Sequence, residues 1–400
     1  MNNAFRNPCN LYTAGWILYY LQGTLYTYGS IYAKILLVIL VAYSIVFVFN
    51  NRQLFRTSYF RILLLLFLML VIYTGFRYAF GETFILGGLV KVKFEMLKNV
   101  TISFAPICCY YGYARKGYLA ESWFKYGALA LLLSAIASFY WEQSYRLSIA
   151  IAEGSSQEEF TNNAGYLFAA IVPMLVLMRS KSWYKFALLL IAFIFSLLAM
   201  KRGALLVIAV VSLIFMWNTL KRSNTFGKIA VLLLSVVFVG VLYYGVTYMM
   251  ETSDYFIYRL EQTREGSSSG RDEMYSEMIH YFIQDSSIFT LLFGHGIDGT
   301  GLLFGNGAHN DWLEFAIDFG LLGLILYIIY WVRLYKVWRT SKDLGLVGVA
   351  MGIIVVSEFM KTFFSFSFNN IPIQLVPAFG YCLACVEMHK MHKTQNLVQQ

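Results

Sequence analysis

The sequence has little charge for its length. Asp, Glu, Lys and Arg make up 13% of the 400 residues, against roughly 25% in a soluble domain. Hydrophobic residues reach 59%, so most of the surface of this chain has to face lipid rather than water. This composition excludes an ordinary soluble globular protein and makes chain length a poor guide to the number of domains.

Acidic residues are the scarcer of the two charged classes. The chain has 22 Asp and Glu against 31 Lys and Arg, a formal net charge of +9. A membrane protein is expected to carry such an excess because its cytoplasmic loops collect Lys and Arg. The sequence has no soluble basic domain that would bind a duplex, so we expect no nucleic-acid partner.

Cysteine and metal-binding patterns are also scarce. Among five cysteines, Cys382 and Cys385 have C-x-x-C spacing but lie inside a hydrophobic segment, where redox and metal chemistry are unusual. The D-x-D motif of many nucleotide-sugar transferases is absent, and no cluster has metal-ligand spacing. We expect neither a metal nor another cofactor. The N-terminal residues lack the pattern of a cleaved signal peptide, so we expect them to be retained.

Long hydrophobic runs are abundant. About 20 apolar residues cross the hydrocarbon core, and the backbone must then be helical. Twelve runs predict spans near 11–27, 31–49, 61–78, 99–113, 123–140, 164–179, 183–200, 203–220, 228–249, 312–332, 344–360 and 371–388. The expected fold is an all-α integral membrane protein of about twelve transmembrane helices. Residues 1–249 and 312–388 would form the bundle and 389–400 a tail.

The basic residues alternate between loops. If the N-terminus is cytoplasmic, the cytoplasmic loops contain clusters such as those at 52–61, 115–125, 179–185, 221–228, 333–342 and 390–393. The opposite loops contain nearly all the other acidic residues. This distribution follows the positive-inside rule and predicts that both termini are cytoplasmic.

One loop, at about 250–311, is much longer than the others. Its segment 272–283 predicts an amphipathic helix, because apolar residues recur at helical spacing while Glu273 and Glu277 lie off that stripe. Residues 293–307 predict a glycine-rich loop. Long ordered loops in compact proteins are usually functional, so we expect a small outer-face lid over the bundle.

Two histidines are candidates for proton transfer. His309 immediately precedes a predicted membrane helix, and His295 lies between glycines. A histidine titrates near neutral pH, which suits proton abstraction. An interfacial histidine that bonds a helix end is the structural alternative for His309.

The polar residues that follow His309 have two interpretations. Asn310, Asp311 and Glu314 occupy a first helical turn, where they would cap free N–H groups or line a substrate site. Asp318 lies further inside the apolar run, where a carboxylate needs a partner. We expect Asp318 to pair with an arginine.

Basic residues on the predicted outer side are unexpected, since the positive-inside rule disfavours them there. Converging cations would suit an anionic ligand, and arginine suits phosphate in particular. Salt bridges with acids of the long loop are the alternative for Arg259 and Arg264. The residues of this class are Arg77, Lys201, Arg202, Arg259, Arg264, Arg271 and Lys361.

Four sequence pieces resemble the O-antigen ligase and polymerase superfamily of bacterial envelope glycosyltransferases. They are "KRGALL" at 201–206, "SGRDEMYSEMIHYF" at 269–282, "FGHG" at 293–296 and "HNDWLEFAIDFGLLG" at 309–323. The last contains the His-Asn, Leu and G-x-x-G pattern of that family. Lys201 departs from the pattern, because the family more often has a small residue there.

The resemblance implies a GT-C-like membrane glycosyltransferase of the bacterial inner membrane with a periplasmic active site. The donor would be an undecaprenyl-pyrophosphate-linked oligosaccharide, and no metal would be required. His309 would activate the acceptor hydroxyl, while Arg202 and Arg271 would hold the pyrophosphate. Arg77, Lys201, Arg259, Arg264, His295, Asn310, Asp311, Glu314 and Lys361 would bind substrate.

The acceptor separates two reactions that share these motifs. A polymerase uses a second lipid-linked glycan, whereas a ligase uses the lipid A core. We expect a polymerase, with a ligase as the alternative, although no residue decides between them. Membrane lipids and a chain-length regulator are the other expected partners. A flippase of polyprenyl-linked sugars is the alternative from another class, but the sequence shows no internal repeat of the kind common in transporters.

Overall fold

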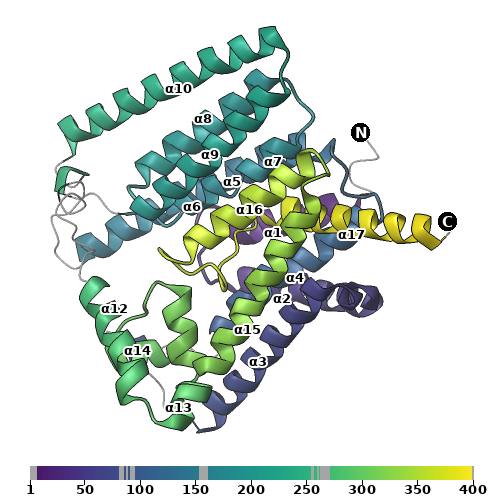
Figure 1. The fold of residues 1–400 in the computed structure, drawn as a ribbon. Helices are drawn as coiled ribbons and strands as arrows, with labels where there is room; N and C mark the ends of the chain where they lie inside the picture. The colour runs from purple at the N-terminus through teal and green to yellow at the C-terminus, as the bar shows by residue number, and fades with distance from the viewer. Residues whose placement is uncertain are drawn as a thin grey trace.

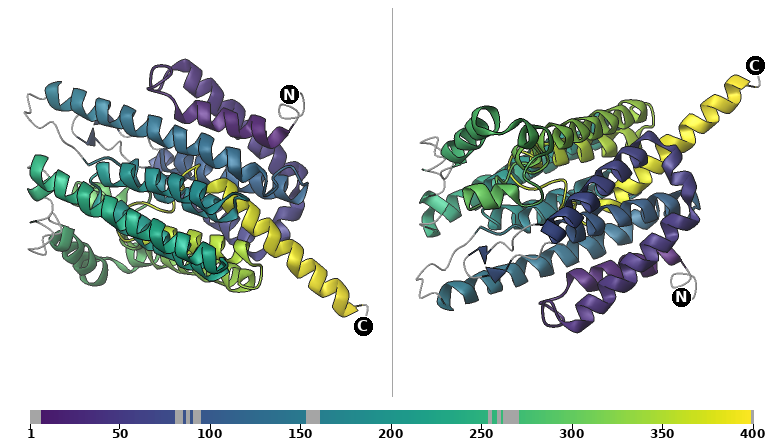
Figure 2. Two further views of the ribbon diagram at one scale, coloured as in Figure 1. Left: turned by 90° about the horizontal axis from the view of Figure 1, so that it is seen from above. Right: turned by 90° about the horizontal axis from the view of Figure 1, so that it is seen from below.

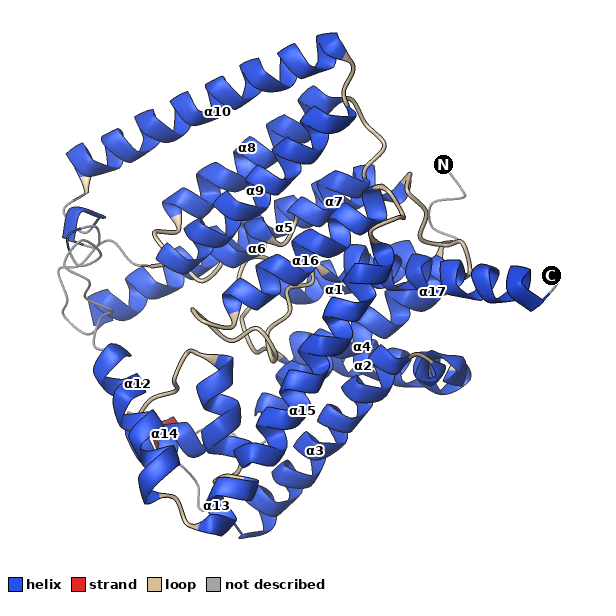
Figure 3. Cartoon of the chain, in the orientation of Figure 1, coloured by secondary structure: helices blue, strands red, loops and turns tan. Residues whose placement is uncertain are grey.

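The computed structural model describes residues 7–80, 85–86, 89–90, 95–152, 161–253, 256–258, 261 and 271–398. Helices dominate these ranges (Figure 3). The strands β1 (Ile85–Leu86) and β2 (Leu89–Val90) form a small antiparallel hairpin. The helical elements are α1 (Pro8–Tyr20), α2 (Ile31–Asn50), the 3₁₀ turn η1 (Arg52–Arg56), α3 (Ser58–Phe80), α4 (Glu95–Arg115), α5 (Trp123–Ala152), α6 (Gly165–Ala169), α7 (Val172–Leu177), α8 (Ser182–Leu198), α9 (Arg202–Arg222), α10 (Thr225–Thr252), α12 (Arg271–His280), the π-helical turn η2 (Tyr281–Asp285), α13 (Ile288–Phe293), α14 (Gly299–Phe304), α15 (Asp311–Ser341), α16 (Leu346–Lys361) and α17 (Val376–Val398).

The helices form one bundle around a core of α4, α15, α16 and α17 (Figure 1). α4 packs along α17, α15 packs on α3 and α16, and α16 packs on α7 and α9. α10 lies at one edge of the bundle against α8 and α9 (Figure 1). The last turns of α17 project from the body (Figure 2).

Six helices of the described ranges are long and apolar enough to cross a membrane, namely α2, α3, α5, α9, α10 and α15. Only 12% of the apolar window of α10 is buried, as expected for a helix that faces lipid. These helices are consistent with an integral membrane protein, but the prediction of about twelve spans is not confirmed. α1, for example, has 13 residues, whereas a span needs about 20.

Two predicted spans are not continuous helices. The run 164–179 is divided into α6 and α7, and Pro173 lies in the first turn of α7. Proline has no N–H to donate and clashes with the preceding turn, which explains the break. The run predicted from residue 371 is non-helical until α17 begins at Val376. Non-helical backbone at membrane depth is tolerated where protein buries it or where it lines a wet cavity.

α15 has a kink that the sequence prediction missed. Gly320 adopts φ 62° and ψ −163° inside this helix, a conformation that only glycine adopts readily. The carbonyl oxygen of Ile317 accepts a hydrogen bond from the N–H of His295 (2.9 Å). A Cβ on Gly320 would lie 2.6 Å from the backbone nitrogen of Gly294. The segment 293–296 therefore packs its backbone directly into the kink.

The long loop is more helical than predicted. α12 and η2 cover the segment where an amphipathic helix was expected, with Met278 buried and Glu273 and Glu277 exposed. The segment 293–307 was expected to be a glycine-rich loop, and this was wrong in part, because it contains the last residue of α13 and all of α14. Its glycines are used at the ends of these short helices, where Gly294 and Gly305 have positive φ.

Basic residues assigned to the cytoplasmic side lie at one end of the bundle. Arg179 forms an ion pair with Glu121, and the Arg222 guanidinium lies beside Gly345. α9 and α15 begin at the other end, which we call the α15 end. The segment 362–364 connects them there: the Asp311 N–H donates to the Thr362 carbonyl (2.9 Å), and a Cβ on Gly203 would contact Phe364.

Candidate active site

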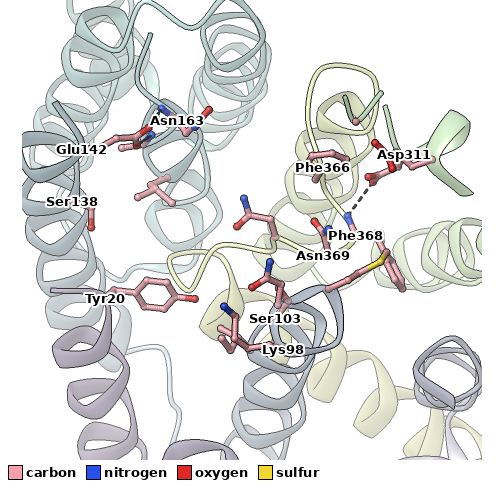
Figure 4. A pocket seen from close by; sticks show the side chains of 18 of the residues that line it. Tyr20, Lys98, Ser103, Ser138, Glu142, Asn163, Asp311, Phe366, Phe368 and Asn369 are labelled. Carbon is pink, nitrogen blue, oxygen red and sulfur yellow. Dashed lines mark hydrogen bonds between the residues drawn. The ribbon is translucent and has the colours of Figure 1, made fainter. Parts of the chain in front are cut away.

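A cavity of about 620 Å³ lies beside the first turn of α15. Its walls come from the end of α1, the first turns of α4, the second half of α5, the start of α6 and residues 366–370. Figure 4 shows aromatic, amide, hydroxyl and charged side chains around this space, among them Tyr20, Lys98, Ser138, Glu142, Asn163 and Asn369. The α15 end therefore offers a polar site of the size of a small sugar chain.

Asp311 holds the 366–370 segment in place. Its side chain is 3% exposed. The carboxylate accepts hydrogen bonds from the Tyr327 hydroxyl (2.7 Å) and from the backbone N–H groups of Ser367 and Phe368 (3.1 and 3.0 Å; Figure 4). A buried carboxylate is stable only with such donors. Asp311 thus fixes one cavity wall through hydrogen bonds to that wall.

Glu314 and Asp318 hold the segment that precedes His309. Glu314 accepts from the Thr300 hydroxyl (2.7 Å) and from the Ala308 N–H (2.6 Å). Asp318 accepts from the N–H groups of Asp298 and Thr300 (3.1 and 2.8 Å) at the start of α14. We expected Asp318 to pair with an arginine, and this was wrong for the part of the chain that the structure describes. The backbone N–H groups at the start of α14 take the place of the arginine, because they also stabilise a carboxylate.

His309 has a strained backbone at the edge of the cavity. Its φ is 52°, a left-handed value that is uncommon for residues other than glycine. Its ring lies 5.2 Å from the ring of Phe366, which lines the cavity. Asn310 follows and caps α15, because its side-chain oxygen accepts from the Trp312 N–H (3.0 Å). Strain of this kind is concentrated at functional sites.

Two lysines meet at one tyrosine ring near α9. The Lys201 Nζ lies 5.9 Å and the Lys361 Nζ 5.6 Å from the ring centre of Tyr166. Lys201 donates to the side chain of Asn163, and Lys361, which is 2% exposed, donates to the Asn370 carbonyl. Both partners line the cavity. The structure thus brings together two residues that are 160 positions apart in the chain.

Arg271 belongs to the same cationic cluster. Burial lowers the pKa of Lys201 to about 8, and the positive charge of Arg271 adds to this effect. Burial also raises the pKa of Tyr275, an effect that Arg271 opposes. Arg271 is the first residue of α12 and Arg202 the first of α9. Lys201, Arg202, Arg271 and Lys361 are called the cationic cluster below.

The remaining predicted residues are not all brought to the site. Arg259 and Arg264 lie outside the described residues, and the same is true of the side chain of Arg77 in α3. The His295 ring nitrogen Nε2 contacts the Tyr281 hydroxyl (3.0 Å), and burial lowers the pKa of His295. Trp312, in the first turn of α15, donates to the Thr362 hydroxyl (2.9 Å).

Sequence analysis missed the wall formed by α5. Glu142 forms an ion pair with Arg146 (2.9 Å) and accepts from the N–H groups of Asn163 and Ala164 (3.0 and 3.1 Å), at the start of α6. The available signal was a charged i, i+4 pair just beyond a predicted span. In the part of the chain that the structure describes, no three His, Cys, Asp or Glu side chains form a metal-binding group.

The sequence of this region matches a known family. Residues 186–328 match the family model described as O-Antigen ligase. This stretch therefore belongs to the O-antigen ligase and polymerase superfamily. It runs from α8 into α15 and contains Arg202, Arg271 and His309. No curated protein matches the chain.

The family match and the apolar helices together indicate a multi-pass membrane protein with O-antigen ligase or polymerase type activity. The matched stretch contains only part of the site. The cationic residues of α9 and α12 and His309 lie inside it, whereas the cavity walls from α1, α4 and α5 and the segment 366–370 lie outside it.

Proposed function

We propose that the protein transfers a glycan from an undecaprenyl-pyrophosphate carrier to a sugar hydroxyl on the periplasmic face of the bacterial inner membrane. The observation that carries this proposal is the position of His309. Its backbone has a left-handed φ, its ring lies 5.2 Å from that of Phe366, which lines the cavity, and it belongs to the stretch that matches the O-antigen ligase family. The topology predicted from loop charges places this end of the bundle outside the cytoplasm.

The reaction follows from the two kinds of groups at the site. The acceptor oxygen attacks the anomeric carbon, and the bond from that carbon to the pyrophosphate oxygen breaks. His309 takes the acceptor proton, and the undecaprenyl pyrophosphate leaves with the electron pair of the broken bond. The cationic cluster stabilises the negative charge on this leaving group. Displacement by a single acceptor inverts the anomeric centre.

The acceptor is a second lipid-linked glycan in the reaction that we favour, which makes the protein a polymerase. Transfer to the lipid A core is the alternative and uses the same residues. The long loop would close over the sugars. This closure would bring Arg271, the first residue of α12, to the site. Asn310, Asp311 and Glu314 act on substrate mainly by holding His309 and the cavity wall in position.

Replacing Arg202 or Arg271 with Gln is expected to weaken use of the donor. A hydrogen bond to a charged group contributes about 1.5–3 kcal/mol, so kcat/KM for the donor should fall roughly ten- to hundredfold. Arg222→Gln is the matched control, because it makes the same change at the opposite end of α9. Equal kcat/KM for Arg202→Gln and Arg222→Gln would remove Arg202 from the proposed role.

The pH dependence of transfer should show the titration of Lys201. Its pKa of about 8 arises from burial, with further lowering by Arg271, Arg146 and Lys361 and opposition from Glu142. The ammonium that attracts pyrophosphate is therefore lost as pH rises through 8, and kcat/KM should fall roughly tenfold between pH 7 and 9. Lys201→Arg keeps its charge over this range and should abolish the decline. A decline that persists unchanged in Lys201→Arg would assign it to another group.

A further inference from the structure

The short helix α13 in the long loop has an exposed apolar face. Its sequence, IFTLLF, contains no charged residue, and none of its six residues is buried. Ile288 and Phe289 are 79% and 67% exposed, and Leu292 is exposed as well. These three side chains are called the α13 face below. Large apolar side chains that are exposed together usually mark a contact with protein or with a membrane.

Two membrane helices show where α13 lies. α15 and α3 are both long and apolar enough to cross a membrane. The end of α13 packs on Gly320 of α15, where a Cβ would lie 2.7 Å from the Leu292 carbonyl oxygen. It also contacts α3, because the Tyr73 hydroxyl donates to the Phe293 carbonyl (2.5 Å). The end of α13 therefore lies beside the walls of two candidate spans (Figure 1).

Charged residues at the other ends of these two helices give the depth of the contact. The apolar run of α15 ends at Arg333, and about 20 residues cross the hydrocarbon core. Counted back from Arg333 at 1.5 Å per residue, Gly320 lies about 10 Å inside the core. The same count from Arg61, which precedes the apolar run of α3, places Tyr73 about 12 Å inside. Both helices thus place the end of α13 at the depth of acyl chains.

The backbone of α13 is suited to this depth. In hydrocarbon, each polar backbone group needs a partner within the protein. The Ser287 hydroxyl accepts from the Thr290 N–H (3.2 Å) at the start of the helix. The Gly294 N–H donates to the Thr290 carbonyl (2.7 Å) at its end, where the Phe293 carbonyl has the Tyr73 hydroxyl as its donor. Both ends of α13 therefore have hydrogen bonds that do not require water.

The neighbouring surfaces indicate what covers the α13 face. On α3, Ile72 and Phe76 lie on either side of Tyr73 and are exposed, and on α15 the exposed Leu322 follows Gly320. On membrane-spanning helices such side chains face lipid. We propose that the α13 face is inserted in the membrane leaflet at the α15 end, where lipid acyl chains cover it.

This insertion anchors the long loop and holds whether or not the protein transfers glycans. The exposed polar residues 284, 285 and 287 come directly before α13 and would lie at the level of the lipid headgroups. α12 then follows the membrane surface, with Glu273 and Glu277 exposed to water. The arrangement resembles an interfacial helix, which places apolar side chains among acyl chains and charged ones in water.

Spin labels on introduced cysteines test the depth of the α13 face. Cys385 is first replaced with Ser, because the other four cysteines are buried. Phe289→Cys is then labelled in the purified full chain and reconstituted in liposomes of phosphatidylethanolamine and phosphatidylglycerol. Collisions of the label are measured with oxygen, which dissolves among acyl chains, and with a nickel chelate, which stays in water. The matched controls are Val236→Cys on the exposed surface of α10 and Glu277→Cys on the exposed polar side of α12.

The label at Phe289→Cys should collide with the chelate at least roughly tenfold less often than the label at Glu277→Cys, since hydrocarbon excludes a polar reagent. Its collisions with oxygen should be as frequent as those at Val236→Cys. Chelate collisions as frequent as those at Glu277→Cys would place the α13 face in water and overturn the proposal. Few collisions with either reagent would also overturn it, because a second copy or another protein segment would then cover the face.

Discussion

Replacing His309 with Asn is expected to reduce glycan transfer by about 10²–10⁴-fold, the usual contribution of a general base. Asparagine tolerates the left-handed conformation that His309 adopts, with φ 52°, better than most residues do. The backbone at the start of α15 should therefore keep its shape, and only the proton acceptor is lost. Initial rates of transfer and thermal stability of the purified protein check this expectation.

The matched control is His280→Asn, because His280 lies on α12 with its side chain 59% exposed. It makes the same chemical change near the site without touching the cavity, and it should transfer at the wild-type rate. If His309→Asn keeps more than about a tenth of the wild-type rate, His309 is not the base. In that case the strain at this position would serve only to fix the 305–310 turn.

Replacing Gly320 with Ala is expected to destabilise the protein by more than about 3 kcal/mol. Its backbone conformation is costly for any residue with a Cβ, and that Cβ would also meet backbone atoms of Leu292 and Gly294 at 2.6 Å. Because the backbone on both sides is packed, no flexible side chain can move away. The fraction of protein that remains monodisperse after heating gives the effect on stability.

Gly75→Ala is the control with an expected effect of opposite sign. Gly75 lies within α3, and a Cβ there would meet nothing within 4 Å. Alanine is the better helix former, so this change should be neutral or stabilising by up to about 1 kcal/mol. If Gly320→Ala were as stable as Gly75→Ala, the kink of α15 would not depend on glycine.

The positions of membrane helices and of His309 were predictable because they depend on local sequence. Apolar runs located α2, α3, α9 and α10 closely, and the polar residues ahead of an apolar run pointed to His309. Lys201, Arg202, Arg271 and Lys361 were singled out because cations are disfavoured on the predicted outer side. That signal depends on charge alone and requires no knowledge of the fold.

The features that sequence analysis missed depend on tertiary contacts. The partner of Asp318 is the start of α14, which appeared in the sequence as a glycine-rich loop. The cavity walls on α4 and α5 carry ordinary amides and hydroxyls, and nothing in the sequence shows that they face the segment 366–370. The kink at Gly320 likewise becomes apparent only when the backbone of Gly294 lies against it.

The most direct test of the central claim is transfer by the purified protein. The protein in detergent is mixed with undecaprenyl-pyrophosphate-linked repeat unit and a chelator, first alone and then with lipid A core. The account predicts that the glycan leaves the pyrophosphate and appears on a sugar hydroxyl, as a ladder of lengthening glycans without core or as a core conjugate with it. A well-folded protein that leaves the donor intact under both conditions, and instead moves it across the bilayer of a proteoliposome, would contradict the account and identify a transporter.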